Sequence, residues 1–173
     1  MGFTPQRNIA TMVLGVGTQP VYLKWNMIGH VIYRPEETET FLDIYYTIEG
    51  LSQKIISNDD NFTMADLGYT GTILASTGYH AAEDEYEDEE IQEIAKRAKV
   101  KFIGHKIEEE WNVILEENEN ISAVALGSTF SAVSTSKNWI RFYSQEGHEF
   151  FTLGISEEVI SLAAHENILS ILY

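Results

Sequence analysis

The fold is decided by residues 121–173, which read ISAVALGSTFSAVSTSKNWIRFYSQEGHEFFTLGISEEVISLAAHENILSILY. Four short segments rich in β-branched and aromatic residues follow one another here, separated by turns such as Ser144–Gly147. The opening pattern then returns. Val159–Ala164 matches Ile121–Leu126 after 38 residues, and Ile168–Leu172 matches Phe130–Ser134. A four-strand unit of about 40 residues is the period of a β-propeller blade.

An earlier copy of this unit precedes it. Met64–Leu67 resembles Val124–Gly127 at an offset of 60 residues, about 20 of which belong to an acidic insertion. In the later unit Tyr143 and Ser144 stand where WD repeats carry their Trp-Asp pair. Further strand-like stretches lie at Val21–Trp25, His30–Tyr33, Thr40–Ile48, Gln53–Ile56, Thr63–Leu67 and Thr72–Ser76. The pattern predicts an all-β propeller with degenerate WD-like blades of four antiparallel strands, and an ordinary β-sandwich is the alternative.

The blade period also limits how much of a propeller the chain can form. A length of 173 residues allows four blades at most, and the insertion reduces this to roughly three and a half. Closed propellers need about four to eight blades. We therefore expect residues 21–173 to form a partial propeller of three to four blades, the front portion of a larger ring. Residues 1–20 are expected to be a linker and first strand.

Residues 80–101 interrupt the strand pattern. Eight acids and no base lie between Glu83 and Glu93, and basic residues follow at Lys96, Arg97, Lys99 and Lys101. Ile91, Ile94, Ala95 and Ala98 have the spacing of one helical stripe. The sequence predicts an acidic, partly helical insertion at residues 80–101 whose basic cluster is neutralised by neighbouring acids. A solvated surface excursion is one interpretation and an interaction tail is the other.

Charge and composition exclude several classes of function. The chain has 27 acidic and 11 basic residues, for a net charge of −16, and residues 83–93 account for half of this excess. Direct binding of nucleic acid or of anionic lipid requires a basic face, so neither is expected. Cysteine is absent, which excludes disulfides, thiolate zinc sites and cysteine nucleophiles. No apolar run approaches the length of a membrane span.

No residues form a convincing catalytic, cofactor or metal site. The five histidines are dispersed, without a pair at metal-ligand spacing. Gly15 and Gly17 lack the third glycine of a dinucleotide fingerprint, because Pro20 stands there. Arg141 alternates with apolar neighbours, which predicts a surface or rim contact. Six aromatic residues are expected in the blade core, with a ligand surface as the alternative; they are Trp25, Trp111, Trp139, Phe142, Tyr143 and Phe151.

Taken together, several segments resemble one protein family. The resemblance spans about Trp25 to Tyr173 and rests on the order and spacing of the segments, the insertion being the least similar part. The segments are Trp25–Gly29, Phe62–Leu67, Glu110–Leu115, Ile121–Gly127, Phe130–Ser136, Ile140–Tyr143 and Val159–His165. They are similar to the middle, SepB-type domain of the minichromosome-loss, chromosome-transmission-fidelity and acidic nucleoplasmic DNA-binding protein family.

The resemblance implies a six-bladed propeller that forms a homotrimer in the full-length, nuclear protein. It implies a non-catalytic scaffold of the replication fork that links the replicative helicase, through GINS, to DNA polymerase alpha. Roles in sister-chromatid cohesion and genome maintenance are also implied. In the family a helical extension after the propeller captures client peptides. None of these 173 residues matches that extension, so no client-binding or trimer-contact residue is assigned.

Two other functions remain as alternatives at this point. One is a generic WD-like propeller that binds proteins outside replication, for instance in trafficking. The other is a carboxylate-based hydrolase in an all-β fold. A preceding WD-repeat domain in the longer protein would favour the replication adaptor over the first alternative.

Overall fold

The computed structural model describes residues 19–78, 97–105 and 109–173, and every regular element in these residues is a β-strand. The strands form three four-stranded antiparallel sheets and one two-stranded antiparallel sheet. The all-β prediction, with blades of four antiparallel strands, is therefore confirmed. The parts of the predicted linker, insertion and helical stripe at residues 1–18 and 79–96 lie outside the described residues.

Each sheet is one blade, and the chain completes one blade before it begins the next. Blade 1 contains β1 (Val21–Trp25), β2 (Gly29–Pro35), β3 (Thr40–Tyr46) and β4 (Lys54–Ser57). Blade 2 contains β5 (Met64–Leu67), β6 (Gly71–Ala75), β7 (Lys99–Gly104) and β8 (Glu110–Ile114). Blade 3 contains β9 (Ile121–Leu126), β10 (Ser131–Thr135), β11 (Trp139–Tyr143) and β12 (Glu149–Gly154). Blade 4 contains β13 (Ser161–His165) and β14 (Ile168–Leu172).

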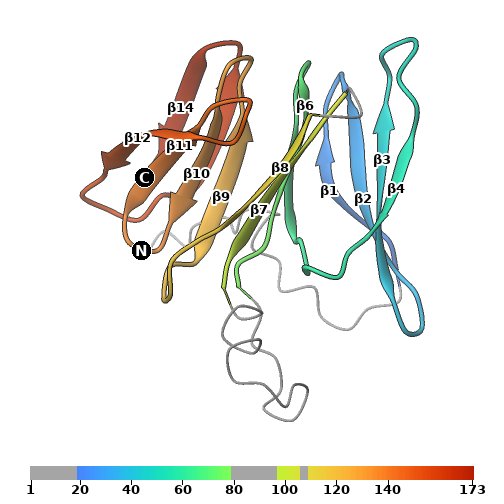
Figure 1. Cartoon of the computed structure of the whole chain (residues 1–173), viewed down its shortest axis with the longest axis horizontal. Coiled ribbons are helices and arrows are strands. Elements are labelled where there is room, and N and C mark those ends of the chain that lie inside the picture. Colours follow the sequence, from blue (N-terminus) through green and yellow to red (C-terminus); the bar gives the residue numbers. More distant parts are fainter. Residues whose placement is uncertain (1–18, 79–96, 106–108) are drawn as a thin grey trace, which may run out of the picture.

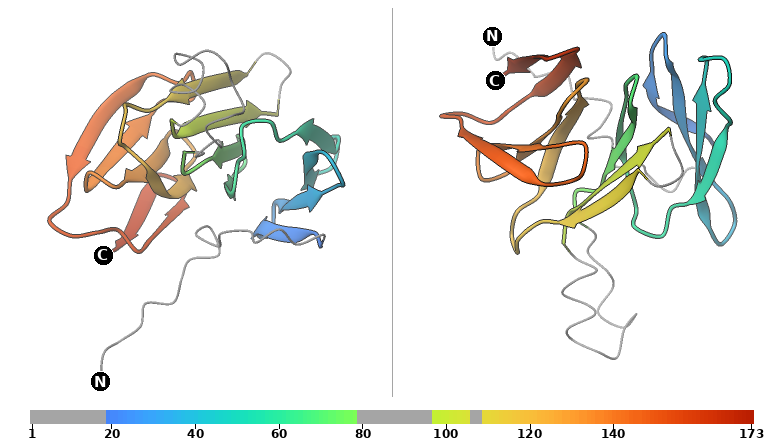
Figure 2. Two further views of the ribbon diagram at one scale, coloured as in Figure 1. Left: turned by 90° about the horizontal axis from the view of Figure 1, so that it is seen from below. Right: turned by 45° about the horizontal axis from the view of Figure 1, so that its top comes forward.

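The blades are arranged around a common axis. Within each blade the strands lie in chain order, and the first strands β1, β5, β9 and β13 follow one another in contact from blade to blade. Figure 1 shows the sheets side by side, and Figure 2 shows them succeeding one another in an arc. Each blade therefore starts at the axis and extends outward, which is the architecture of a β-propeller.

One apolar cluster lies between each pair of consecutive blades. Leu42 and Leu74 belong to the cluster of blades 1 and 2, Ile73 and Val133 to that of blades 2 and 3, and Ala132 and Leu162 to that of blades 3 and 4. Blades 2 and 3 consequently bury both of their faces. All residues of β5, β6 and β10 are buried, so these strands lack the alternation of apolar and polar residues that a sheet with one solvated face shows.

The blade against which each side chain packs shows which residues occupy equivalent positions in successive blades. Val124 and Leu162 each pack against the preceding blade, which agrees with the predicted spacing of 38 residues. In blade 2 the residue that packs against the preceding blade is Ala65, not Met64. The equivalent of Val124 is therefore Ala65, at an offset of 59, and the predicted offset of 60 is wrong by one. Because side chains alternate along a strand, an error of one residue in the offset assigns every side chain of the strand to the wrong face of the sheet.

The predicted insertion does not extend to residue 101. Lys99–Gly104 form β7, which pairs with both β6 and β8. Ala98 immediately precedes this strand, is buried in the core and is not helical. From Lys99 to Phe102 basic and apolar residues alternate with the period of a strand. This alternation and the pairing of β7 with strands on both sides favour a strand from Lys99 onward. The helical stripe predicted from the spacing of apolar residues therefore does not continue through Ala98.

The aromatic residues divide between core and surface. Tyr143 is fully buried, and Trp111 and Phe142 pack against apolar clusters from partly buried positions. Trp25, Trp139 and Phe151 are exposed to 77%, 37% and 53%, so the core prediction is wrong for these three. Phe151 lies on β12, the outermost strand of blade 3, beside which no further strand lies in the described chain.

Candidate functional site at the axial mouth

The innermost strands end together at one end of the molecule, around a cavity of about 360 Å³. Four segments that close or follow these strands supply its walls. We call this site the axial mouth; it is lined by residues of Lys24–Ile28, Asp66–Tyr69, Leu126–Ser128 and Ala164–Glu166. All four blades therefore contribute residues to the cavity.

Asp66 connects three blades at this mouth. Its buried carboxylate accepts hydrogen bonds from the backbone N–H of Leu67 in its own blade and of Leu126 in blade 3, each at 2.9 Å. Lys24 of blade 1 completes the arrangement with an ion pair of 2.8 Å to Oδ1. A carboxylate with three such partners is held in one orientation. Asp66 therefore serves to fix the blades relative to one another.

Backbone and amide hydrogen bonds complete the connection between blades. The Asn26 side chain donates to the carbonyl of Leu67 at 2.9 Å and accepts from the N–H of Ile28 at 2.9 Å. Ser128 N–H donates to the carbonyl of Glu166 at 2.7 Å, which joins blade 3 to blade 4. The mouth is consequently a rigid surface rather than a set of independent loops.

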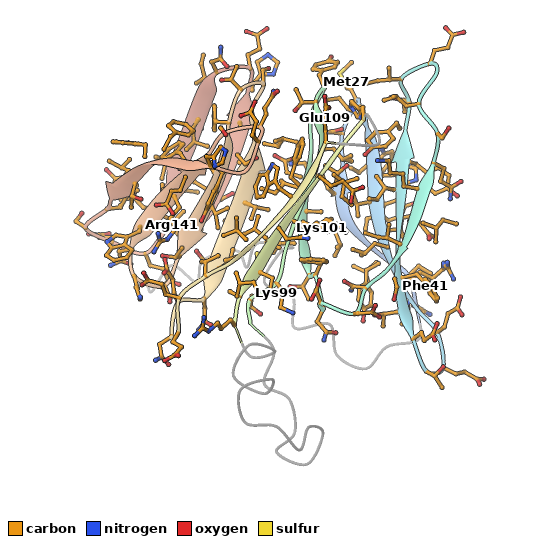
Figure 3. The ribbon with its side chains drawn as sticks, viewed as in Figure 1. Met27, Phe41, Lys99, Lys101, Glu109 and Arg141 are labelled. Atoms are coloured by element: carbon orange, nitrogen blue, oxygen red, sulfur yellow. The ribbon has the colours of Figure 1, made fainter. Side chains whose placement is uncertain are left out.

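Large apolar side chains stand exposed around this rigid mouth. Met27 is 93% exposed, Trp25 77% and Tyr69 69%. Figure 3 shows Met27 at one end of the molecule, well away from Arg141 on blade 3. A contiguous group of exposed apolar residues around a concavity is typical of a protein-interaction site.

A larger cavity of about 580 Å³ lies beside the mouth, between blade 2 and the β11–β12 turn of blade 3. We call it the interblade cavity. Tyr69 lines both cavities, so they adjoin on the surface. Trp111 stacks on Phe102 with ring centroids 5.7 Å apart and lies 5.7 Å from Tyr143. Its indole N–H donates to the carbonyl of Gln145 at 2.9 Å, which ties blade 2 to the turn of blade 3.

His105 also lines the interblade cavity. Its ring packs edge-on against Tyr46, with centroids 4.7 Å apart. Burial lowers the pKa of His105, and the nearby charge of Lys54 acts in the same direction. The imidazole is therefore neutral at pH 7 and adds no positive charge to this cavity.

Arg141 is not the surface residue that the alternation predicted. Its guanidinium donates two hydrogen bonds of 2.8 Å to the carboxylate of Glu119, which is fully buried, and two more to Glu149. Burial alone would raise the pKa of Glu119, but the hydrogen bonds from Arg141 outweigh it and the pKa is lowered. These groups are paired with one another, so the cluster is a structural clamp between the β8–β9 connection and blade 3.

The predicted basic cluster is neutralised by acids outside the insertion. Arg97 pairs with Glu117 at 2.9 Å and Lys99 with Asp60 at 2.6 Å, while Lys101 lies 3.7 Å from Glu110. Lys96 lies outside the described residues. Residues 19–78, 97–105 and 109–173 contain no group of three or more His, Asp or Glu side chains placed to hold a metal ion. These described ranges also hold no helix long and apolar enough to span a membrane.

Sequence reasoning did not identify the axial mouth. One signal was present: Asp66 is an acid in the middle of the otherwise apolar segment Met64–Leu67. A buried acid in an innermost strand indicates a partner in a neighbouring blade. The partners themselves lie 42 and 60 residues away, at Lys24 and Leu126, and no local pattern links them.

Comparison with known proteins finds longer relatives that contain a segment similar to this chain. The chain is 26% identical over 164 residues to WD repeat and HMG-box DNA-binding protein 1 of Homo sapiens and of Xenopus laevis. These alignments cover 91% of the chain and 14% of each relative, so the chain spans about one seventh of the relatives' length. The crystal structure of HIRA(644-1017) aligns with a TM-score of 0.43 and 14% identity over 58% of this chain and 28% of that chain.

The family comparison covers the whole sequence. The model of the minichromosome loss protein Mcl1 middle region matches residues 1–173. The observed blades include the segments on which the resemblance rested, from Trp25–Gly29 at the axial mouth to Val159–His165 in blade 4. The chain therefore belongs to the family of the minichromosome loss protein Mcl1 middle region.

Proposed function

We propose that this chain is part of a non-catalytic adaptor of the DNA replication fork, in a nuclear protein that links the replicative helicase to DNA polymerase alpha. Family membership supports this role, and the matching relatives are named as WD-repeat, DNA-binding proteins. In the full-length protein the propeller has six blades and the protein is a homotrimer. Contributions to sister-chromatid cohesion and genome maintenance belong to the same proposal.

The axial mouth is the observation that carries the proposal. It presents Trp25, Met27 and Tyr69 on a rigid frame, as protein docking requires. Asp66, the buried acid of the mouth, already accepts bonds from Lys24 and two backbone amides. It is therefore not available as a general acid or base, which favours binding over catalysis.

The charge of the chain supports contact with the fork through proteins. A net charge of −16 repels the phosphate backbone. The described basic residues Arg97, Lys99 and Lys137 are paired with acids. We therefore assign any DNA binding by the full-length protein to regions other than these 173 residues.

The adaptor role is tested on the full-length protein. Light scattering is expected to give the mass of a trimer, and fluorescently labelled peptides of DNA polymerase alpha and GINS are expected to bind. A strict monomer that binds neither peptide would refute the adaptor role.

The contribution of the mouth is tested by a double variant, Trp25→Ala with Met27→Ser. We expect it to weaken capture of a fork partner at least about fivefold, because two exposed apolar contacts are removed. Phe151→Ser is the matched control, since it removes an exposed aromatic ring from blade 3. Equal capture by both variants would show that the mouth is not the docking surface.

A further inference from the structure

The interblade cavity has a shape and position suited to one side chain of a docked peptide. It is the larger of the two cavities described, at about 580 Å³ against 360 Å³. Tyr69 forms part of both walls and is 69% exposed. A peptide lying on the axial mouth therefore reaches the interblade cavity by crossing a single residue.

The wall of this cavity is aromatic and fixed in place. Trp111 is held by its stacking on Phe102 and by its hydrogen bond to Gln145. Gly147, with φ +84°, allows the β11–β12 turn to approach the indole closely, since a Cβ there would lie 2.6 Å from Trp111 Cγ. Such a wall packs well against the aliphatic stem of a long side chain.

Carboxylates stand at the rim of the same cavity. Glu110 and Glu146 both line it and are exposed. Lys101 forms a long ion pair with Glu110, whose Oε2 lies 3.7 Å from Nζ, which is beyond the distance of a direct hydrogen bond. A hydrogen bond from Ser144 lowers the pKa of Glu146, so that carboxylate is ionised at pH 7. None of the lining residues is a lysine or an arginine.

The chemistry of the occupant follows from these walls. A metal ion is disfavoured because the described residues place no three acidic or histidine ligands together. Nucleic acid is repelled by the carboxylates. An organic cation on an aliphatic stem matches both parts of the cavity. Its stem can pack against the aromatic wall, and its charge can pair with the carboxylates at the rim.

We propose that the interblade cavity binds an arginine or lysine side chain of a partner peptide whose apolar residues lie on the axial mouth. The proposal rests on the proposed function, since it names the peptide chemistry that the propeller recognises. It predicts a recognition motif with one basic residue a short distance from apolar residues.

The test compares peptides that differ only in the charge of one side chain. The probes are fluorescein-labelled Leu-Ser-Ala-Xaa-Ala-Ser-Leu amides in which Xaa is arginine, its uncharged isostere citrulline, or glutamate. Binding to the full-length protein is followed by fluorescence polarisation at low and at physiological salt. We expect the arginine peptide to bind at least about fivefold more tightly than the citrulline peptide, and the glutamate peptide to bind most weakly.

Two matched variants locate the effect. Glu110→Gln with Glu146→Gln is expected to weaken the arginine peptide about five- to tenfold and to leave the citrulline peptide unchanged. Glu157→Gln with Glu158→Gln removes the same charge from an exposed loop outside the cavity and is expected to change neither. Circular dichroism checks that all variants are folded.

Either of two results would overturn the proposal: equal binding of the arginine and citrulline peptides, or equal effects of the two double variants. These results concern the cavity only, because the probes contain no fork protein. Binding of polymerase alpha and GINS by a trimer would stand in that case, so failure of this inference is distinguishable from failure of the adaptor role.

Discussion

Replacing Arg141 by alanine is the sharpest test of the clamp between blade 3 and the preceding connection. In the native structure both carboxylate oxygens of Glu119 accept a hydrogen bond of 2.8 Å from the guanidinium. The other cation within reach is Lys137, whose Nζ lies 3.7 Å from Glu119 Oε2. The substitution therefore leaves a fully buried carboxylate without its main partner.

The expected loss of unfolding free energy is about 3 kcal/mol at pH 7. Removing one partner of a buried ion pair costs about 3–5 kcal/mol, because the remaining charge is left uncompensated. We take the lower end because Lys137 can shorten its contact. The bonds from Arg141 to the partly exposed Glu149 add little.

The loss depends on pH in a defined direction. In the native protein the pKa of Glu119 is below its ordinary value, so its stabilising contribution is present above that ordinary value and falls as pH drops through the lowered one. Without Arg141, Thr135 and Lys137 are the remaining influences that oppose burial, and we expect the pKa of Glu119 to be higher than in the native protein. The variant then binds a proton more readily when folded, and the difference from the native protein shrinks as pH decreases from 7 toward 4.5.

The assay is urea denaturation followed by tryptophan fluorescence, at both pH values. Arg141→Ala, Glu119→Gln and the double variant form a cycle that isolates the coupling between the two side chains. Lys137→Ala is the control for an exposed pair and is expected to cost less than about 1 kcal/mol. A loss below about 1 kcal/mol for Arg141→Ala at pH 7, or an equal loss at both pH values, would refute the reasoning.

Three further predictions concern other parts of the fold. Gly147→Ala is expected to cost about 1–3 kcal/mol and to alter the fluorescence of Trp111, because it places a Cβ at φ +84° and 2.6 Å from the indole; an unchanged urea midpoint would contradict this. Trp25→Ala is expected to change the free energy of unfolding, measured by urea denaturation, by less than about 0.5 kcal/mol, since the ring is exposed, whereas a core tryptophan would cost about 3–5 kcal/mol. Burial raises the pKa of Tyr143 to about 12, so stability is expected to fall between about pH 10, where an unfolded tyrosine ionises, and pH 12. Alkaline titration of tyrosinate absorbance checks this, and Tyr143→Phe should remove the last-titrating component.

Most of the fold could be predicted from local patterns. The strands of blade 3 were identified because aromatic and β-branched runs alternate with turns such as Ser144–Gly147. The β7 strand was missed because it begins directly after a charged segment. Its first residues were therefore counted as part of the acidic, partly helical insertion. The alignment of Met64 with Val124 was wrong by one residue because β5 is buried on both sides. A strand buried on both sides lacks the alternation of polar and apolar residues from which the register is read.

The candidate site could not be predicted in the same way. Asp66, Lys24 and Leu126 belong to three different blades, and their contact depends on how consecutive sheets pack around the axis. Arg141 illustrates the same limit, since its partner Glu119 lies 22 residues earlier in a connection without regular structure. Local alternation predicts the face of the sheet on which a side chain lies. The residue that it contacts there depends on how the blades pack.

In blades 2 and 3 burial decreases from the axis to the periphery, and this gradient has a consequence for dynamics and for variation. Every residue of β5 is buried, whereas five of the six residues of β12 are exposed. Amide protons of the inner strands β5 and β9 should therefore exchange only in the largest openings, and those of the outer strands β8 and β12 in small local ones. The periphery can then open, or accept substitutions that suit a new contact, while the geometry of the axial mouth is preserved.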